Sequence, residues 1–178
     1  MKNKFTENYS KEFRAFALSK IFESSDKSMH VHLLSREGEL KQFSDNIKFF
    51  NNELDVIVYP SWDCFPYSNI SPRKEIISKR YSALRASKRK SQNRKIILMS
   101  IDSILQKIVP ITEIIVKSFS LDINQEVDFL RLIEWLEKIG YSRQENVYSV
   151  GEYAVRGGIL DIFVPEVKYP IRLDFFGT

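Results

Sequence analysis

The chain has 178 residues, a hydrophobic fraction of 43%, a charged fraction of 28% and a net charge of +4. It is too apolar for a disordered chain, and six glycines exclude a collagen-like repeat. No apolar run approaches the ~20 residues of a membrane-spanning helix, and the amino terminus lacks the apolar core of a secretory signal. A single cysteine, Cys64, excludes an intrachain disulfide, so we expect a cytoplasmic protein that contacts no membrane.

The first part of the chain alternates helix and strand patterns. The expected strands are Met29 to Leu34, Val56 to Tyr59 and Ile96 to Ile101. Before and between them we expect three helices: one that Ser10 can cap, with apolar positions Phe13, Phe16, Ala17 and Ile21; one with Leu40, Phe43, Ile47 and Phe50 on one stripe; and one starting at Ser71 and Pro72, with Ile76, Ile77, Tyr81 and Leu84 facing inward. A short helix over Asp102 to Ile108 follows the last strand. Because the strands are almost continuously apolar, the pattern predicts an α/β domain with a parallel sheet covered by helices on both faces.

The pattern then changes, which predicts a second, smaller α+β domain with antiparallel hairpins. The expected segments are a linking strand over Ile114 to Phe119; a helix from about Gln125 with Val127, Leu130, Ile133 and Leu136, ended by Gly140; and strands over Glu152 to Arg156, Ile159 to Phe163 and Ile171 to Phe176. Gly157 and Gly158 favour a hairpin turn because both can take positive φ. The last strand reaches Thr178 without a closing element, so we interpret the chain as a fragment. The domains are predicted at 1–113 and 114–178.

No nucleotide site is expected in this chain. No glycine precedes Gly38 and no glycine is followed by lysine, so the phosphate loop G-x-x-x-x-G-K-[ST] is absent, as is G-x-G-x-x-G. His30 and His32 would share one face of a strand, and Cys64 could complete a metal site. However, no Cys-x-x-Cys or His-x-x-x-His pair supports this, and a lone cysteine beside aromatics is usually a small apolar residue. We expect no metal, no cofactor and no catalytic residue.

The positive charge is concentrated in one acid-free segment. Its basic residues are Arg85, Lys88, Arg89, Lys90, Arg94 and Lys95. Without these six, 21 basic residues face 23 acidic ones and the net charge is −2. The segment is either a solvated surface loop or a contact to the phosphate backbone of nucleic acid. It lacks interleaved aromatic residues for base stacking, which argues against recognition of a single strand.

The last strands carry a second candidate surface. Alternation places Ile171, Leu173 and Phe175 on one face and Arg172, Asp174 and Phe176 on the other, and it places Arg156 on a polar face too. Arginine and phenylalanine on an exposed sheet are typical of a protein-binding surface, because guanidinium binds carboxylates and the ring supplies buried area. The alternative is that Phe176 is covered by further chain and that the arginines pair with Asp174, Glu152 or Glu166.

Two segments carry a resemblance to a known family. GEYAVRGGILDIFVP with YPIRLDFFG, over Gly151 to Gly177, resembles the module shared by bacterial transcription-repair coupling factor (Mfd) and the excision-repair helicase subunit UvrB. YPSWDCFPYSNISPRKEIISKRYSAL, over Tyr59 to Leu84, looks like the coupling factor. UvrB would need a phosphate loop and a tyrosine-rich hairpin, and neither is present. The alternatives left open are a UvrB fragment or a helicase-like domain that binds the DNA backbone.

The resemblance implies that this is the amino-terminal module of a longer protein, similar to UvrB domains 1 and 2, with a degenerate helicase-like first domain. Full-length coupling factors are ATP-driven DNA translocases that act on stalled RNA polymerase and recruit UvrA. The resemblance therefore implies UvrA as the partner of this module. RNA polymerase, double-stranded DNA, ATP, Mg and a carboxy-terminal masking domain would belong to the full-length protein. The family's UvrA-binding arginines and phenylalanine match Arg156, Arg172 and Phe176 here.

Overall fold

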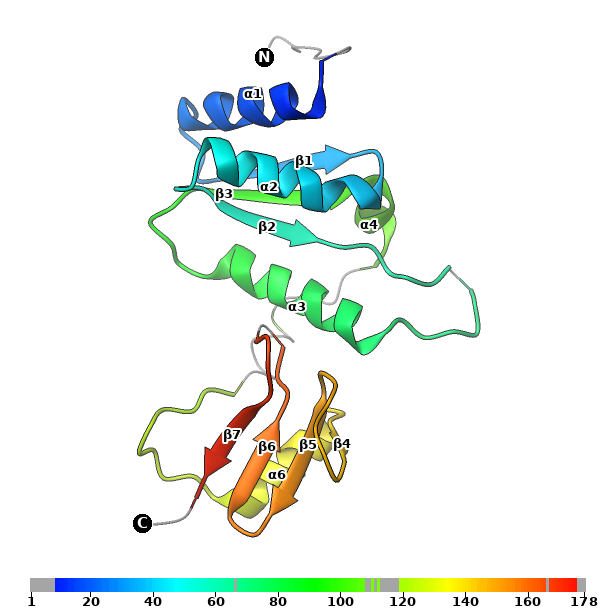
Figure 1. The fold of residues 1–178 in the computed structure, drawn as a ribbon, viewed down its shortest axis with the longest axis vertical. Helices are drawn as coiled ribbons and strands as arrows, with labels where there is room; N and C mark the ends of the chain where they lie inside the picture. The colour runs from blue at the N-terminus through cyan, green and yellow to red at the C-terminus, as the bar shows by residue number, and fades with distance from the viewer. Residues whose placement is uncertain are drawn as a thin grey trace. The chain divides into compact units, whose positions relative to one another are not determined.

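The computed structural model describes residues 9–65, 67–107, 110, 112, 119–165 and 167–175 (Figure 1). The chain divides into two compact units, one of residues 1–62 and 83–108 and the other of residues 63–82 and 109–178. The grouping of 63–82 with the later part was not expected from the sequence pattern. The boundary expected between residues 113 and 114 stays a prediction, because residues 113–118, and with them nearly all of the expected linking strand, lie outside the described residues.

The elements up to residue 105 largely follow the segments expected from the sequence. They are α1 (Lys11–Glu23), β1 (Met29–Leu34), the 3-10 helix η1 (Glu37–Glu39), α2 (Leu40–Phe50), β2 (Asp55–Tyr59), α3 (Lys74–Lys88), β3 (Lys95–Ser100) and α4 (Ile101–Leu105). Helix α3 begins two residues beyond Pro72, and Ser100 caps α4 by accepting a hydrogen bond from the Ser103 N–H at 3.1 Å.

The first sheet is parallel and has the strand order β1-β3-β2. Residues of α1 and α2 pack against Ile96 and Leu98 on one face, while Ala83 of α3 packs with Tyr59 and Met99 on the other (Figure 1). Alternate residues of β3 thus face two different helical layers, which is why this strand is apolar throughout. The predicted α/β class, with helices on both faces of a parallel sheet, is confirmed.

The core of the first unit is built from large side chains that are at most 2% exposed, namely Phe22, Leu40, Phe43, Ile47, Ile96 and Leu98. Burying one such side chain contributes about 1.5–3 kcal/mol to folding. None of the helices in the described part of the chain is both long and apolar enough to cross a membrane.

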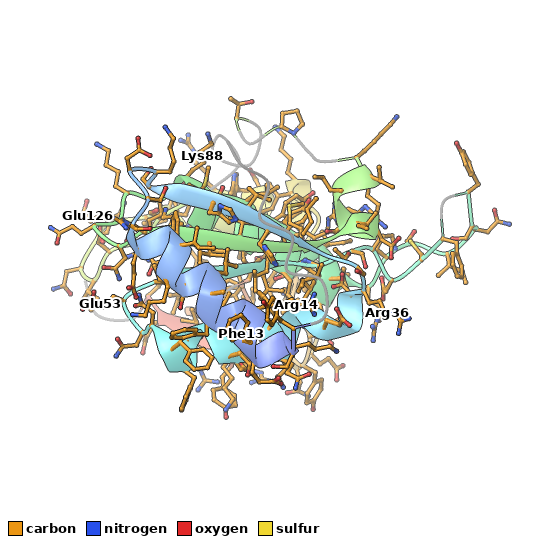
Figure 2. The ribbon with its side chains drawn as sticks, turned by 90° about the horizontal axis from the view of Figure 1, so that it is seen from above. Phe13, Arg14, Arg36, Glu53, Lys88 and Glu126 are labelled. Carbon is orange, nitrogen blue, oxygen red and sulfur yellow. The ribbon has the colours of Figure 1, made fainter. Side chains whose placement is uncertain are left out.

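Helix α1 begins as expected but buries a different face. Ser10 accepts a hydrogen bond from the Phe13 N–H at 3.2 Å, which confirms the predicted cap. The buried residues are Ala15, Leu18, Ser19 and Phe22, whereas Phe13, Phe16 and Ile21 are 39–52% exposed. Figure 2 looks onto α1, with Phe13 and the neighbouring Arg14 labelled. Two apolar stripes occur at helical spacing in this segment, and packing against α2 and β1 decides which one is buried.

The second unit holds a helix and a mixed four-stranded sheet. Its elements are α6 (Phe129–Lys138), β4 (Ser142–Arg143), β5 (Glu152–Arg156), β6 (Ile159–Ile162) and β7 (Ile171–Asp174). The strand order is β4-β5-β6-β7; the β5–β6 and β6–β7 pairs are antiparallel, and the two-residue strand β4 is parallel to β5 (Figure 1). The predicted hairpins are confirmed, and β4 was not expected.

Helix α6 starts later than expected because of its cap. Asp128 accepts hydrogen bonds from the Leu130 and Arg131 N–H groups at 3.1 and 3.2 Å, so the helix begins at Phe129 and not near Gln125. Leu132 and Leu136 are buried, whereas Leu130, expected to face the core, is 70% exposed.

Two glycines lie where the backbone takes a positive φ angle that other residues rarely adopt. Gly140 takes φ +98° just after α6, and Gly157 takes φ +61° in the β5–β6 turn. Gly158 is not among the glycines with positive φ, so the turn uses this region at the first of its two glycines.

His32 of β1 lies in an aromatic stack within the first unit. Its ring is 5.0 Å from that of Phe43, with an interplanar angle of 6°, and 6.3 Å from the ring of His30. Burial, together with the smaller effects of the positive charges of His30 and Arg14, lowers the pKa of His32 to about 4. Burial also lowers the pKa of His30. Both rings do lie on one face, as expected, but they pack there as neutral aromatic groups.

We expect the free energy of unfolding to decrease as the pH falls from 6.5, the ordinary pKa of histidine, to about 4, the lowered pKa of His32. In this range the unfolded chain binds a proton that the folded chain excludes, so stability is complete above pH 6.5 and falls by at most about 3 kcal/mol. Urea unfolding at pH 7 and pH 5, followed by circular dichroism, measures the change. His32→Phe keeps a ring against Phe43 and should remove most of the decrease; an unchanged decrease in this variant would assign the effect to other groups.

Candidate functional site

The antiparallel sheet places its polar residues on the face opposite to its core. Tyr153, Leu160 and Leu173 belong to the core of the second unit. In the next row of cross-strand partners, Asp161 of β6 pairs with Arg172 of β7 on one side and with Ala154 of β5 on the other. Because side chains alternate along each strand, this row lies on the opposite face of the sheet, where Ala154 is itself buried and Arg172 is exposed. The polar positions predicted for Arg156 and Arg172 agree with this geometry.

Asp161 brings the two arginines together. Arg172 donates from Nε to Asp161 Oδ1 at 2.7 Å and from Nη2 to Oδ2 at 2.9 Å, and Arg156 Nη1 lies 3.7 Å from the same Oδ2. The Asp161 side chain is only 16% exposed, whereas those of Arg156 and Arg172 are 53% and 61% exposed. We call these three residues the arginine cluster. It carries a formal charge of +1 and presents guanidinium groups to solvent.

The pKa of Asp161 is held below its usual range, chiefly by the hydrogen bond from Arg172, against an opposing effect of burial. The positive charges of Arg172 and Arg156 lower it further. In turn, the Asp161 hydrogen bond raises the pKa of Arg172. Asp161 and Arg172 therefore both stay ionised at neutral pH. Since the arginines are mostly exposed, solvent screens the pairs, and they position side chains more than they stabilise the fold.

Arg156 makes a second set of contacts, to the loop between β4 and β5. Its Nη2 donates to the Glu145 carbonyl oxygen at 2.7 Å and to Asn146 Oδ1 at 2.6 Å. A carboxylate from β5 holds the same loop, because Glu152 Oε2 accepts from the Tyr148 and Ser149 N–H groups at 2.9 and 2.8 Å. We call residues 144–151 the β4–β5 loop.

The arginine cluster and the β4–β5 loop line an open hollow of about 540 Å³. Its lining residues are Asn146, Val147, Tyr148, Arg156, Asp161, Pro170 and Arg172. Donors from guanidinium and apolar area from Tyr148 and Pro170 suit a protein segment that combines a carboxylate with an apolar side chain.

Asp161 was missed as the partner of the arginines. The sequence had suggested Asp174, Glu152 or Glu166 as the acidic partners. Glu152 instead binds loop amides, and Glu166 lies outside the described residues. The charge of Asp174 makes a smaller contribution than Asp161 to raising the pKa of Arg172. Alternation in β6 places Asp161 between Leu160 and Ile162 and could have identified it, provided that the hairpin register was known. Phe176 also lies outside the described residues, so its place on this face stays a prediction.

Two of the six basic residues in the acid-free segment donate hydrogen bonds to carbonyl oxygens near helix ends. Arg94 Nη1 donates to the Phe22 carbonyl oxygen at 2.7 Å and to that of Glu23. The Lys95 ammonium donates to the carbonyl oxygens of Ala86 at 2.8 Å, Ser87 at 3.3 Å and Arg89. These cations satisfy the free carbonyls at the ends of α1 and α3 and interact favourably with the helix dipoles.

Lys95 is 8% exposed because it begins the buried strand β3. Nη1 of Arg94 is likewise turned to the protein backbone. The remaining four basic residues, Arg85, Lys88, Arg89 and Lys90, lie in the last turn of α3 and just beyond it. Their contact with nucleic acid stays a prediction.

The histidines and the cysteine form no metal site within the described part of the chain. No group of three His, Cys, Asp or Glu side chains in that part is arranged to hold a metal ion. His30 and His32 pack against aromatic rings, as described above, and Cys64 is a half-buried free thiol.

We expect Lys95→Met to lower the free energy of unfolding by about 2 kcal/mol, because it leaves carbonyl oxygens at the end of α3 without their donor. Urea unfolding followed by circular dichroism measures this loss. Lys88→Met at the exposed end of the same helix is the matched control and should change stability by less than about 0.5 kcal/mol. Equal stability of the two variants would contradict the capping role of Lys95.

Comparison with known proteins gives a consistent result. The family model of the UvrB interaction domain matches residues 119–178. The chain is 35% identical to the transcription-repair-coupling factor of Haemophilus influenzae over 122 residues. The aligned region covers 68% of the chain and 10% of that relative. Its counterpart in Escherichia coli is 29% identical over 143 residues, with 80% of the chain and 12% of the relative covered. The transcription-repair-coupling factor of Rickettsia bellii is 27% identical over 162 residues, which cover 91% of the chain and 14% of that relative. The chain thus spans about a tenth of the length of these curated relatives.

Proposed function

The chain belongs to the transcription-repair-coupling factor family, and we propose that it is a non-catalytic interaction module that docks the excision-repair protein UvrA. The observation that carries the proposal is the arginine cluster, in which Asp161 holds Arg156 and Arg172 on an exposed sheet face. The match of the UvrB interaction domain to residues 119–178, which include this face, supports it.

The chemistry of the surface favours a protein partner with acidic residues. A guanidinium can bind a carboxylate through paired N–H groups, as Arg172 binds Asp161, and the adjoining hollow offers apolar area. Arginine is enriched among the residues that dominate binding energy at protein interfaces. We infer that Arg156 and Arg172 pair with acidic side chains of UvrA and that Phe176 adds an apolar contact.

In the longer proteins of the family, we propose that this module brings UvrA to DNA where RNA polymerase has stalled. The translocase activity, with its ATP and Mg, and the contacts to RNA polymerase and double-stranded DNA would then reside in other parts of the protein. A carboxy-terminal domain would mask the arginine cluster until the motor engages. The proposed location is the cytoplasm, where these partners act.

Arg172→Ala and Arg156→Ala should each weaken binding of the 178-residue chain to UvrA at least tenfold, because each removes a charge-assisted contact from the centre of the interface. Calorimetric titration with UvrA measures the affinity. Arg131→Ala is the matched control, since Arg131 is an 86% exposed arginine on α6 of the same unit. Wild-type affinity in both cluster variants, with the fold intact by circular dichroism, would exclude this surface as the UvrA site.

Binding of the DNA backbone is the alternative function, and the four basic residues at the end of α3 favour it. A gel shift with duplex DNA tests it: we expect weak binding that disappears as salt increases. Replacing Arg85, Lys88, Arg89 and Lys90 by glutamine should abolish that binding without changing the affinity for UvrA. Tight duplex binding at physiological salt would favour the alternative.

A further inference from the structure

We propose that the β4–β5 loop is part of the UvrA docking site, that Tyr148 is its aromatic contact, and that Arg156 is also the positioning residue that holds this loop in place. The inference rests on the proposed function and extends it to residues outside the three assigned by family resemblance. It commits to one partner, a UvrA segment that combines a carboxylate with an apolar side chain.

Tyr148 has the exposure and the location of an interface anchor. Its side chain is 79% exposed and lines the same hollow as Arg156 and Arg172. Tyrosine is enriched among residues that dominate interface energies, because it offers a large apolar ring at a low cost in side-chain entropy. Val147 and Pro170 line the hollow beside it, so a partner residue entering there would contact apolar groups on one side and guanidinium groups on the other.

The loop that carries Tyr148 is held at two points before any partner arrives. Glu152 accepts hydrogen bonds from the Tyr148 and Ser149 N–H groups, which fixes the backbone at the aromatic residue. Arg156 binds the Glu145 carbonyl oxygen and the Asn146 side chain, which ties the start of the loop to strand β5. A contact residue on a preorganised loop loses less conformational entropy on binding than one on a free loop.

The two arginines therefore have different roles. Both N–H donors used towards the loop come from Nη2 of Arg156, while Arg172 makes its hydrogen bonds to Asp161 through Nε and Nη2. Removing Arg172 takes a binding group away from the surface. Removing Arg156 also releases the loop, so part of its effect on binding should pass through Tyr148. The effects of substituting Arg156 and Tyr148 on binding should therefore not add, whereas those of two independent contact residues would.

Calorimetric titration of the 178-residue chain with UvrA tests the contact role. Tyr148→Ala should weaken binding about tenfold and Tyr148→Phe less than about threefold, because the ring and not the hydroxyl makes the contact. Tyr9→Ala, at a 55% exposed tyrosine of the other unit, is the matched control and should leave the affinity unchanged. Wild-type affinity of Tyr148→Ala, or a tenfold loss in Tyr148→Phe, would overturn the assignment of the ring.

A double-mutant cycle tests the positioning role. In the Arg156→Ala background, Tyr148→Ala should weaken binding less than about twofold further, whereas in the Arg172→Ala background it should retain most of its tenfold effect. Hydrogen exchange of the free chain gives a second readout: amide exchange at Tyr148 and Ser149 should be about tenfold faster in Arg156→Ala and unchanged in Arg172→Ala. Equal effects in both backgrounds, together with unchanged exchange, would overturn it.

The same titrations separate this inference from the proposed function. If Arg172→Ala loses binding and Tyr148→Ala does not, UvrA docks on the arginine cluster and the inference about the loop is wrong. If the wild-type chain does not bind UvrA, the proposed function fails, and the inference fails with it.

Discussion

The two-residue period of the β5–β6–β7 sheet is the constraint on which the candidate site depends. Alternation sends Tyr153, Leu160 and Leu173 into the core of the second unit and sends Asp161 and Arg172 to the opposite face. A shift of register by one residue would exchange the two sets and bury charges in place of apolar groups. The apolar core therefore fixes the cross-strand partners of the arginine cluster, and both stability and the proposed recognition of UvrA rely on the same hydrogen-bonded pairing.

The basic residues show why sequence neighbourhood alone does not assign a task to a charge. Lys90 and Lys95 lie five positions apart in one acid-free segment, yet Lys90 is exposed while Lys95 is buried with its ammonium on carbonyl oxygens at the end of α3. Arg94 similarly closes the end of α1. A helix that ends beside a buried strand leaves free carbonyls that need donors, and long basic side chains reach them. Two residues of this basic segment, Arg94 and Lys95, therefore bind carbonyl oxygens near helix ends.

Sequence patterns predicted every described strand except β4, both hairpins and the parallel sheet, because these depend on apolar runs and alternation that are local in the chain. They predicted Arg156 and Arg172 on the polar face for the same reason. The buried face of α1 was not predictable in this way, since Phe13 and Leu18 lie on competing apolar stripes that only packing separates. Asp161 as the shared partner, and the β4–β5 loop held by Arg156, depend on register and on contacts between strands, which no local pattern encodes.

For the proposed docking of UvrA, Asp161 would also make the surface selective. A bare pair of arginines attracts any polyanion, including the phosphates of a DNA backbone, in proportion to its charge. The carboxylate between Arg156 and Arg172 halves the net charge and occupies the Nε–Nη2 edge of Arg172. An incoming group must then approach the donors that remain, in a set direction. For a protein whose relatives couple transcription to DNA repair, such an arrangement disfavours nonspecific capture by nucleic acid and favours a partner whose shape matches the hollow.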